Sequence, residues 1–148
     1  MYYNLANIEG MKMVKVFLSC SSHDQTYIKY IIDDLRTLPE KYKLFYFLPP
    51  YKKDIPIDNI IERLYDIDLF ILFITNNSLN SQFVQRELSQ AIYLNNLNRI
   101  KEICPISLDN SIDVFKDSRI PEYIKNRIYL SESPLETVQI VRNFILNY

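Results

Sequence analysis

Phe83 and Glu87 stand four residues apart, just after the polar stretch of residues 75–81. If a helix begins near Ser81, this spacing places both side chains on the same face. A buried strand, a polar loop and then a helix start with an aromatic ring and a carboxylate on one face indicate a ligand-binding edge. The other interpretation is structural: the helix dipole favours a glutamate in the first turns by roughly 0.3–1 kcal/mol, and Phe83 would then be plain core. The residues alone leave both interpretations open.

A second polar group follows another apolar run and includes Ser19, Cys20 and Ser21. In the same stretch Ser22 or Asp24 can cap a following helix. The single histidine, His23, has no cysteine or carboxylate at metal-ligand spacing, so we interpret it as a surface residue beside a helix cap and predict no metal site. With one glycine in the chain, a glycine-rich phosphate loop is excluded in its usual form.

Length and composition restrict the class of protein. The 148 residues suffice for one domain with a core, and 48% hydrophobic with 24% charged residues is ordinary globular composition. A net charge of −1 gives no reason to expect nucleic acid as a partner. The longest apolar run has six residues, whereas a membrane span needs about 20. We predict a leader over residues 1–12 and one domain over 13–148.

Two further observations concern the cellular compartment. The chain begins without the basic start and apolar run of a secretory signal. Cys20 and Cys104 lie beside apolar runs and show no disulfide or zinc spacing, which favours a reducing compartment. We therefore expect a cytoplasmic protein without a membrane partner.

Five short apolar runs alternate with segments of helical periodicity, which predicts an α/β fold with helices on both faces of a parallel sheet. The expected strands are residues 14–18, 44–48, 69–74, 100–108 and 127–130. The expected strand order is the flavodoxin-like 2-1-3-4-5, in which ligands bind at the carboxyl ends of the strands. That edge would be built from residues 19–24, 48–56 and 75–81.

The helix after Ser81 has a predicted core stripe, and the two candidate residues are placed beside it. The stripe consists of Val84, Leu88, Ala91 and Ile92. Phe83 and Glu87 would lie on the flank, continued by Gln90 and Leu94. Glu87 is thus expected at the border of the core. Further helices are predicted from residues 22–24 to Pro39, from Pro56 to Leu64, over 120–125 and over 134–148.

The order of these motifs resembles the TIR domain. Phe17, Leu18 and Ser19 match its F-x-S box at the end of the first strand. Ser81, Phe83 and Glu87 match its later serine, aromatic and glutamate, with phenylalanine in place of the usual tryptophan. Residues 103–109 resemble its fourth strand, and residues 48–57 stand where its BB loop lies, without the glycine often found there. The resemblance covers residues 14–109 well and the remainder by topology.

The resemblance implies an enzyme that cleaves NAD, with Glu87 as the catalytic residue. Nicotinamide leaves as a neutral molecule, so one carboxylate could suffice where ordinary glycosidases need two. Phe83 would stack on the nicotinamide, and Ser19, Cys20 and Ser21 would line the nucleotide side of the cleft. NAD is then substrate, no other cofactor is expected, and the products are nicotinamide with ADP-ribose or a cyclic isomer.

The family also implies partners and alternatives. Such enzymes act in antiviral defence, so a separate effector or sensor protein is a possible partner. Self-association would involve residues 48–57, and activity would depend on protein concentration. The alternatives are a non-enzymatic TIR–TIR interaction module and an enzyme that transfers nucleoside N-glycosyl groups.

Overall fold

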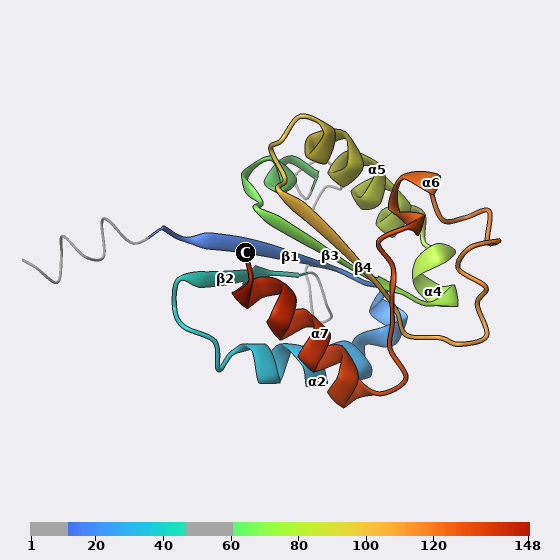
Figure 1. The fold of residues 1–148 in the computed structure, drawn as a ribbon, viewed down its shortest axis with the longest axis horizontal. Coiled ribbons are helices and arrows are strands. Elements are labelled where there is room, and N and C mark those ends of the chain that lie inside the picture. The colour runs from blue at the N-terminus through green and yellow to red at the C-terminus, as the bar shows by residue number, and fades with distance from the viewer. Residues whose placement is uncertain (1–11, 47–60) are drawn as a thin grey trace, which may run out of the picture.

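Five parallel strands form the centre of the computed structural model, which describes residues 12–46 and 61–148. Their order is β2-β1-β3-β4-β5, the order expected from the sequence (Figure 1). The strands are β1 (Val14–Ser19), β2 (Tyr42–Phe45), β3 (Leu69–Ile74), β4 (Glu102–Ser107) and β5 (Tyr129–Leu130). The predicted α/β class and sheet topology are therefore confirmed.

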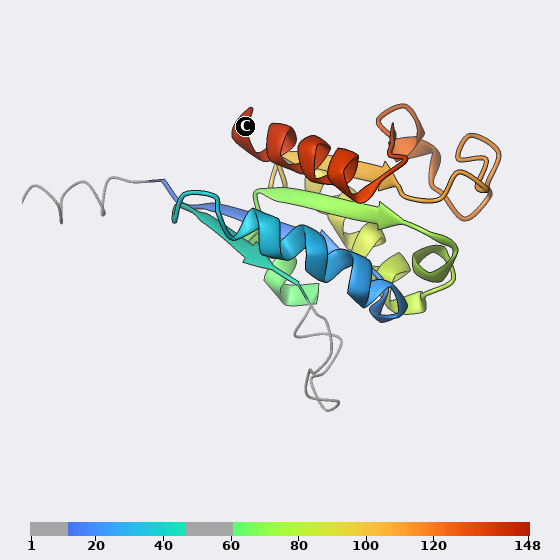
Figure 2. The same cartoon turned by 90° about the horizontal axis from the view of Figure 1, so that it is seen from below.

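Helices cover both faces of this sheet. On one face lie α2 (Gln25–Leu35) and α7 (Pro134–Leu146), and on the other lies α5 (Gln82–Asn96) (Figures 1 and 2). Alternate residues of a strand face opposite sides, so β1 sends Val16 and Leu18 toward α2 and α7 but Phe17 toward α5. The central strand β3 is buried along its whole length, as a strand covered on both faces must be.

Several strand ends differ from those predicted. β2 begins at Tyr42, two residues before the predicted start, and its predicted last residues lie outside the described part of the chain. β4 and β5 are both shorter than the predicted runs, since β4 begins at Glu102 and β5 at Tyr129. The predicted apolar runs are longer than the hydrogen-bonded strands because residues next to a strand can also be buried.

Pro105 lies inside β4, although a proline was expected only near a strand end or at an edge. The N–H of Leu108 points toward β3, where it donates to Ile74 O, and the carbonyl of Ser107 points toward β5. By alternation, Pro105 faces β5. β5 pairs with Ile106 and Ser107 only, so the missing N–H falls where the sheet has no ladder bond to lose.

The predicted polar turn over residues 75–81 contains a short helix, α4 (Asn76–Leu79). Thr75 and Ser78 form a capping box at its start, which explains why so polar a sequence folds as a helix. Ser81 then caps α5 by accepting from the N–H of Val84, as predicted for a helix that starts there.

The remaining elements are short. Ser22–Asp24 and Leu64–Asp66 form the 3-10 turns η1 and η2, and Glu122–Lys125 forms α6 within the predicted residues 120–125. α2 ends at Leu35, before Pro39, and α7 ends at Leu146. Residues 1–11 of the predicted leader, and residues 48–57 with the start of the helix expected from Pro56, lie outside the described residues.

No helix in residues 12–46 or 61–148 is long and apolar enough to cross a membrane.

Candidate active site

Glu87 lies inside the core and not at its border. Its side chain is 2% exposed, and the buried positions of α5 are Val84, Glu87, Leu88, Ala91 and Leu94. The prediction that Glu87 and Leu94 lie on the flank is therefore wrong, whereas Ile92 of the predicted stripe is half-buried and packs against the core. Glu87 is three residues after Val84 and four before Ala91, which is the spacing of a single helix face. The spacing could have revealed this, but a carboxylate is rarely placed in a core stripe.

The Glu87 carboxyl meets the end of β1. The hydroxyl of Ser19 donates a hydrogen bond of 2.8 Å to Glu87 Oε1. Ser19 is the last residue of β1 and is 1% exposed. It follows Phe17 by two positions, so strand alternation directs both toward α5. Two candidate residues predicted separately from the sequence are thus direct partners.

Burial changes the acidity of this carboxyl. Removal from water raises the pKa of Glu87 from 4.5 to about 8, and the hydrogen bond from Ser19 opposes the rise only in part. At neutral pH the resting carboxyl is therefore mostly protonated. A strongly perturbed titratable group at the carboxyl ends of parallel strands is typical of a functional site.

The titratable neighbour of Glu87 is Cys20, which follows Ser19 and is nearly buried. Burial, with smaller effects from Glu87 and Asp24, raises the pKa of Cys20 to about 12. A thiol in this state is a weak nucleophile at neutral pH. The Cys20 side chain packs in the apolar cluster beneath α2 and α7.

The loop after β1 is held differently from the prediction. Ser21 caps η1 by accepting from the N–H of His23, whereas neither Ser22 nor Asp24 caps the following helix through its side chain. Ser21 is buried and its hydroxyl is engaged in this cap. His23 is exposed beside the cap, as interpreted from the sequence.

Asp24 instead connects two loops at the carboxyl edge of the sheet. Its carboxylate accepts hydrogen bonds from Thr75 Oγ1 at 2.6 Å and from Asn77 Nδ2 at 2.8 Å. This contact fixes the β1 loop against α4 and so helps to hold the backbone around Cys20. Thr75 and Asn77 belong to the edge predicted over residues 75–81, but their contact with Asp24 was not predicted, because partners 51 or 53 residues apart leave no spacing pattern.

Phe83 lies one helical turn before Glu87 on α5. Its ring is partly buried and packs against the apolar cluster beneath α5. Phe83 is thus half-buried, and its packing against this cluster fixes its position. The predicted shared direction of Phe83 and Glu87 thus holds along the helix, but Glu87 lies deeper.

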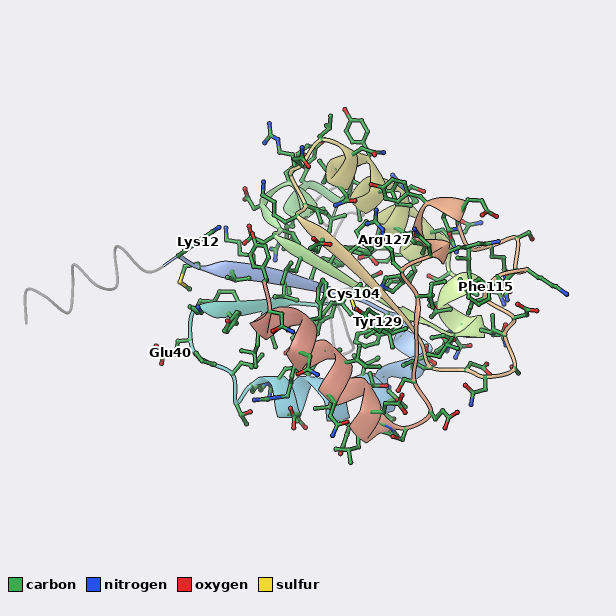
Figure 3. All side chains as sticks on the ribbon, in the orientation of Figure 1. Lys12, Glu40, Cys104, Phe115, Arg127 and Tyr129 are labelled. Atoms are coloured by element: carbon green, nitrogen blue, oxygen red, sulfur yellow. The ribbon has the colours of Figure 1, made fainter. Side chains whose placement is uncertain are left out.

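Hydrogen bonds from Arg119 join the loop between β4 and α6 to Asn76 and Asn80, at the two ends of α4. Arg119 also donates to Asp117. The same loop carries the exposed Phe115, at the end of the molecule where α4 lies (Figure 3). The loop between β4 and α6 is thus anchored to α4 and Asn80 through Arg119, a contact that the sequence did not indicate.

The second cysteine lies apart from the carboxyl. Cys104 packs in the cluster beneath α2 and α7, on the opposite face of the sheet from α5 and Glu87. Burial raises its pKa to about 12. Among residues 12–46 and 61–148, no three cysteine, histidine, aspartate or glutamate side chains are grouped so that they could hold a metal ion.

The arrangement can stabilise positive charge when the carboxyl is ionised. A single carboxyl in a poorly hydrated site interacts strongly with a nearby cation because little water screens the charge. A cationic ligand would in turn lower the pKa of Glu87 and favour ionisation.

Comparison with known families matches residues 16–136 to the family described as TIR domain. Comparison with curated proteins gives no match.

Proposed function

We propose, from the premise that this chain belongs to the TIR domain family, that it cleaves the bond between nicotinamide and ribose in NAD. Glu87 would be the catalytic carboxylate, and the second product would be ADP-ribose or a cyclic isomer. The observation that carries the proposal is the buried carboxyl of Glu87 at the end of β1, hydrogen-bonded by Ser19.

The proposed reaction needs one ionised carboxylate. The bond between C1′ and the pyridinium nitrogen breaks with its electron pair going to nitrogen, so neutral nicotinamide leaves without a general acid. Positive charge develops on the ribose, and the carboxylate of Glu87 stabilises it. Water attack at C1′ followed by proton loss gives ADP-ribose, and attack by a nucleophile within the same molecule gives the cyclic isomer.

Other candidate residues would form the walls of the site. Phe83 would stack on the nicotinamide ring, and Cys20 and Ser21 would line the nucleotide side. In this proposal NAD is the substrate and no further cofactor takes part. The cationic nicotinamide would favour ionisation of Glu87 as it binds.

One observation favours a second function, that of an interaction module without catalysis. Glu87 is only 2% exposed and Phe83 packs against the core. In such a module both residues would fix α5 against the sheet, and function would depend on contacts between TIR domains. Assembly through residues 48–57 remains a prediction from the resemblance, because these residues lie outside those described.

The biological setting of the proposed activity is antiviral defence, either through loss of NAD or through a signalling product. A separate effector or sensor protein would then be a partner. As predicted from the resemblance, activity should rise with protein concentration if assembly completes the site.

The test is release of nicotinamide from NAD by purified protein at high concentration, beside Glu87→Gln and the control Glu102→Gln. Glu102 is exposed at the far end of β4, so its loss should leave the rate unchanged. Release by wild type and by Glu102→Gln, with none from folded Glu87→Gln, is expected. Absence of release from crowded wild-type protein would favour the interaction module.

A further inference from the structure

The two oxygens of the Glu87 carboxyl have different surroundings. Oε1 accepts the hydrogen bond from Ser19. Within the part of the chain that the structure describes, Oε2 accepts no hydrogen bond, although no fully enclosed side-chain oxygen there lacks a partner. Oε2 therefore holds the small accessible fraction of the carboxyl. One oxygen is anchored to the sheet, and the other is left to meet a ligand.

Ser19 is rigidly held, as an anchor must be. It ends β1, pairs in register with Leu72 of the fully buried β3, and is itself buried. Its hydroxyl proton is used by Glu87 Oε1. A hydroxyl that is 1% exposed and already engaged is poorly placed to hydrogen-bond a nucleotide. This argues against the substrate-contacting role that the resemblance implied for Ser19.

We propose that Ser19 is a positioning residue that acts through Glu87: it holds Oε1 so that Oε2 faces the ribose on which positive charge develops. The inference rests on the proposed NAD cleavage and deepens it by separating Ser19 from the residues that contact substrate. A hydrogen bond from a rigid donor orients a carboxylate and also stabilises its ionised form. Loss of the donor should therefore impair both orientation and ionisation.

Within the described part of the chain, few titratable groups on the neighbouring elements lie close enough to Glu87 to alter how its carboxyl titrates. β3 and α4 carry no titratable side chain. Directly after β1 the neighbour is Cys20, whose pKa is raised to about 12. On β4, Cys104 packs on the other face of the sheet and Glu102 is exposed at the far end, while Tyr65 and Asp66 of η2 are exposed. Because Ser19 lowers the pKa of Glu87, removal of its hydroxyl should raise that pKa further.

The experiment compares wild type with Ser19→Ala, Ser19→Thr and a matched control, Ser107→Ala. Ser107 is also a buried serine at the carboxyl end of a strand, but its hydroxyl donates to the carbonyl of Asp109. Rates of nicotinamide release are measured against NAD concentration and pH. In parallel, carboxyl carbon NMR follows the Glu87 titration, identified by the signal missing from Glu87→Gln.

We expect Ser19→Ala to lower kcat about 10- to 100-fold, the range of one hydrogen bond to a charged group, with KM within about twofold of wild type. In Ser19→Ala, the acid limb of the pH–rate profile and the NMR titration of Glu87 should both move to higher pH. Ser19→Thr, which keeps the hydroxyl, should restore both toward wild type, and Ser107→Ala should match wild type. If Ser19→Ala does not fold, Ser19→Cys serves, because it nearly keeps the volume while donating only weakly.

The outcomes separate this inference from the function on which it rests. No release from wild-type protein overturns both. Release by wild type together with an unchanged kcat and acid limb in Ser19→Ala overturns the positioning role alone. A raised KM with an unchanged pH profile also overturns it, because Ser19 would then contact the substrate directly.

Discussion

The hydroxyl of Ser19 and the carboxyl of Glu87 lie 2.8 Å apart although 68 residues separate them in sequence. One ends a strand and the other lies in the buried stripe of a helix. The candidate site is therefore built on the regular elements, which hold side chains more precisely than loops do. Its carboxyl also affects the stability of the fold, so the site can be tested with and without substrate.

Glu87 should make the folded protein less stable as pH rises. Its folded pKa of about 8 lies above the ordinary 4.5. Between these values the unfolded chain releases the proton that the folded protein keeps, so the free energy of unfolding falls with rising pH. The loss is absent below about pH 4.5 and complete well above pH 8, where it is on the order of 5 kcal/mol.

Glu87→Gln should remove this dependence, which urea unfolding at pH 5 and pH 8.5 would measure. Other shifted groups titrate outside the range from pH 5 to pH 8.5. Folding raises the pKa of Cys20 and Cys104 from 9.0 and lowers the pKa of Asp117 from 3.8. Glu102→Gln is the control and should retain the wild-type loss. A wild-type stability that stays constant or rises over this range would contradict the buried state of Glu87.

The proposed cleavage of NAD should be faster at alkaline pH. If the ionised carboxylate is the active form, kcat/KM should increase about tenfold per pH unit below the pKa of Glu87 in the free enzyme and level off above about 8. A profile of kcat/KM from pH 5.5 to 9.5 measures this. A rate that falls as pH rises through this range would indicate that the protonated carboxyl is the active form.

Phe83 should affect substrate binding through its ring. Phe83→Leu removes the aromatic face, and we expect kcat/KM for NAD to fall about 5- to 100-fold, as for loss of one stacking contact. Phe83→Trp should retain activity, since the family usually has tryptophan there. Equal rates for all three proteins would limit Phe83 to packing, and thermal unfolding should confirm that each variant is folded.

Asp24 should stabilise the fold through its contacts with α4. Asp24→Ala leaves Thr75 and Asn77 without their acceptor, and we expect a loss of about 1–3 kcal/mol in the free energy of unfolding. Asp33→Ala is the matched control, because Asp33 forms an exposed ion pair with Arg36 and should change stability by less than about 0.5 kcal/mol. Equal losses for the two variants would show that the loop contact adds nothing.

The topology could be predicted because its signals are local. The apolar run Leu69–Ile74 is a whole strand in the structure, and the serine at position 81 caps the helix that it was expected to begin. The depth of Glu87 was not predicted, although its spacing from Val84 and Ala91 is that of one helix face, because a carboxylate is rarely placed in a core. Its burial depends on Ser19, a partner from a distant strand. The helix α4 was not predicted, for a different reason. Its capping box uses Thr75 and Ser78, and residues of these types are also common in turns.

The short pairing of β5 with β4 indicates which edge of the sheet opens locally. Pro105 has no N–H toward β5, and β5 is paired only at Tyr129 and Leu130, so few hydrogen bonds join the last strand to the rest. In native-state hydrogen exchange, the amides of β5 should therefore exchange through local opening. Those of β3, bonded on both sides within the core, should exchange only when the whole domain unfolds.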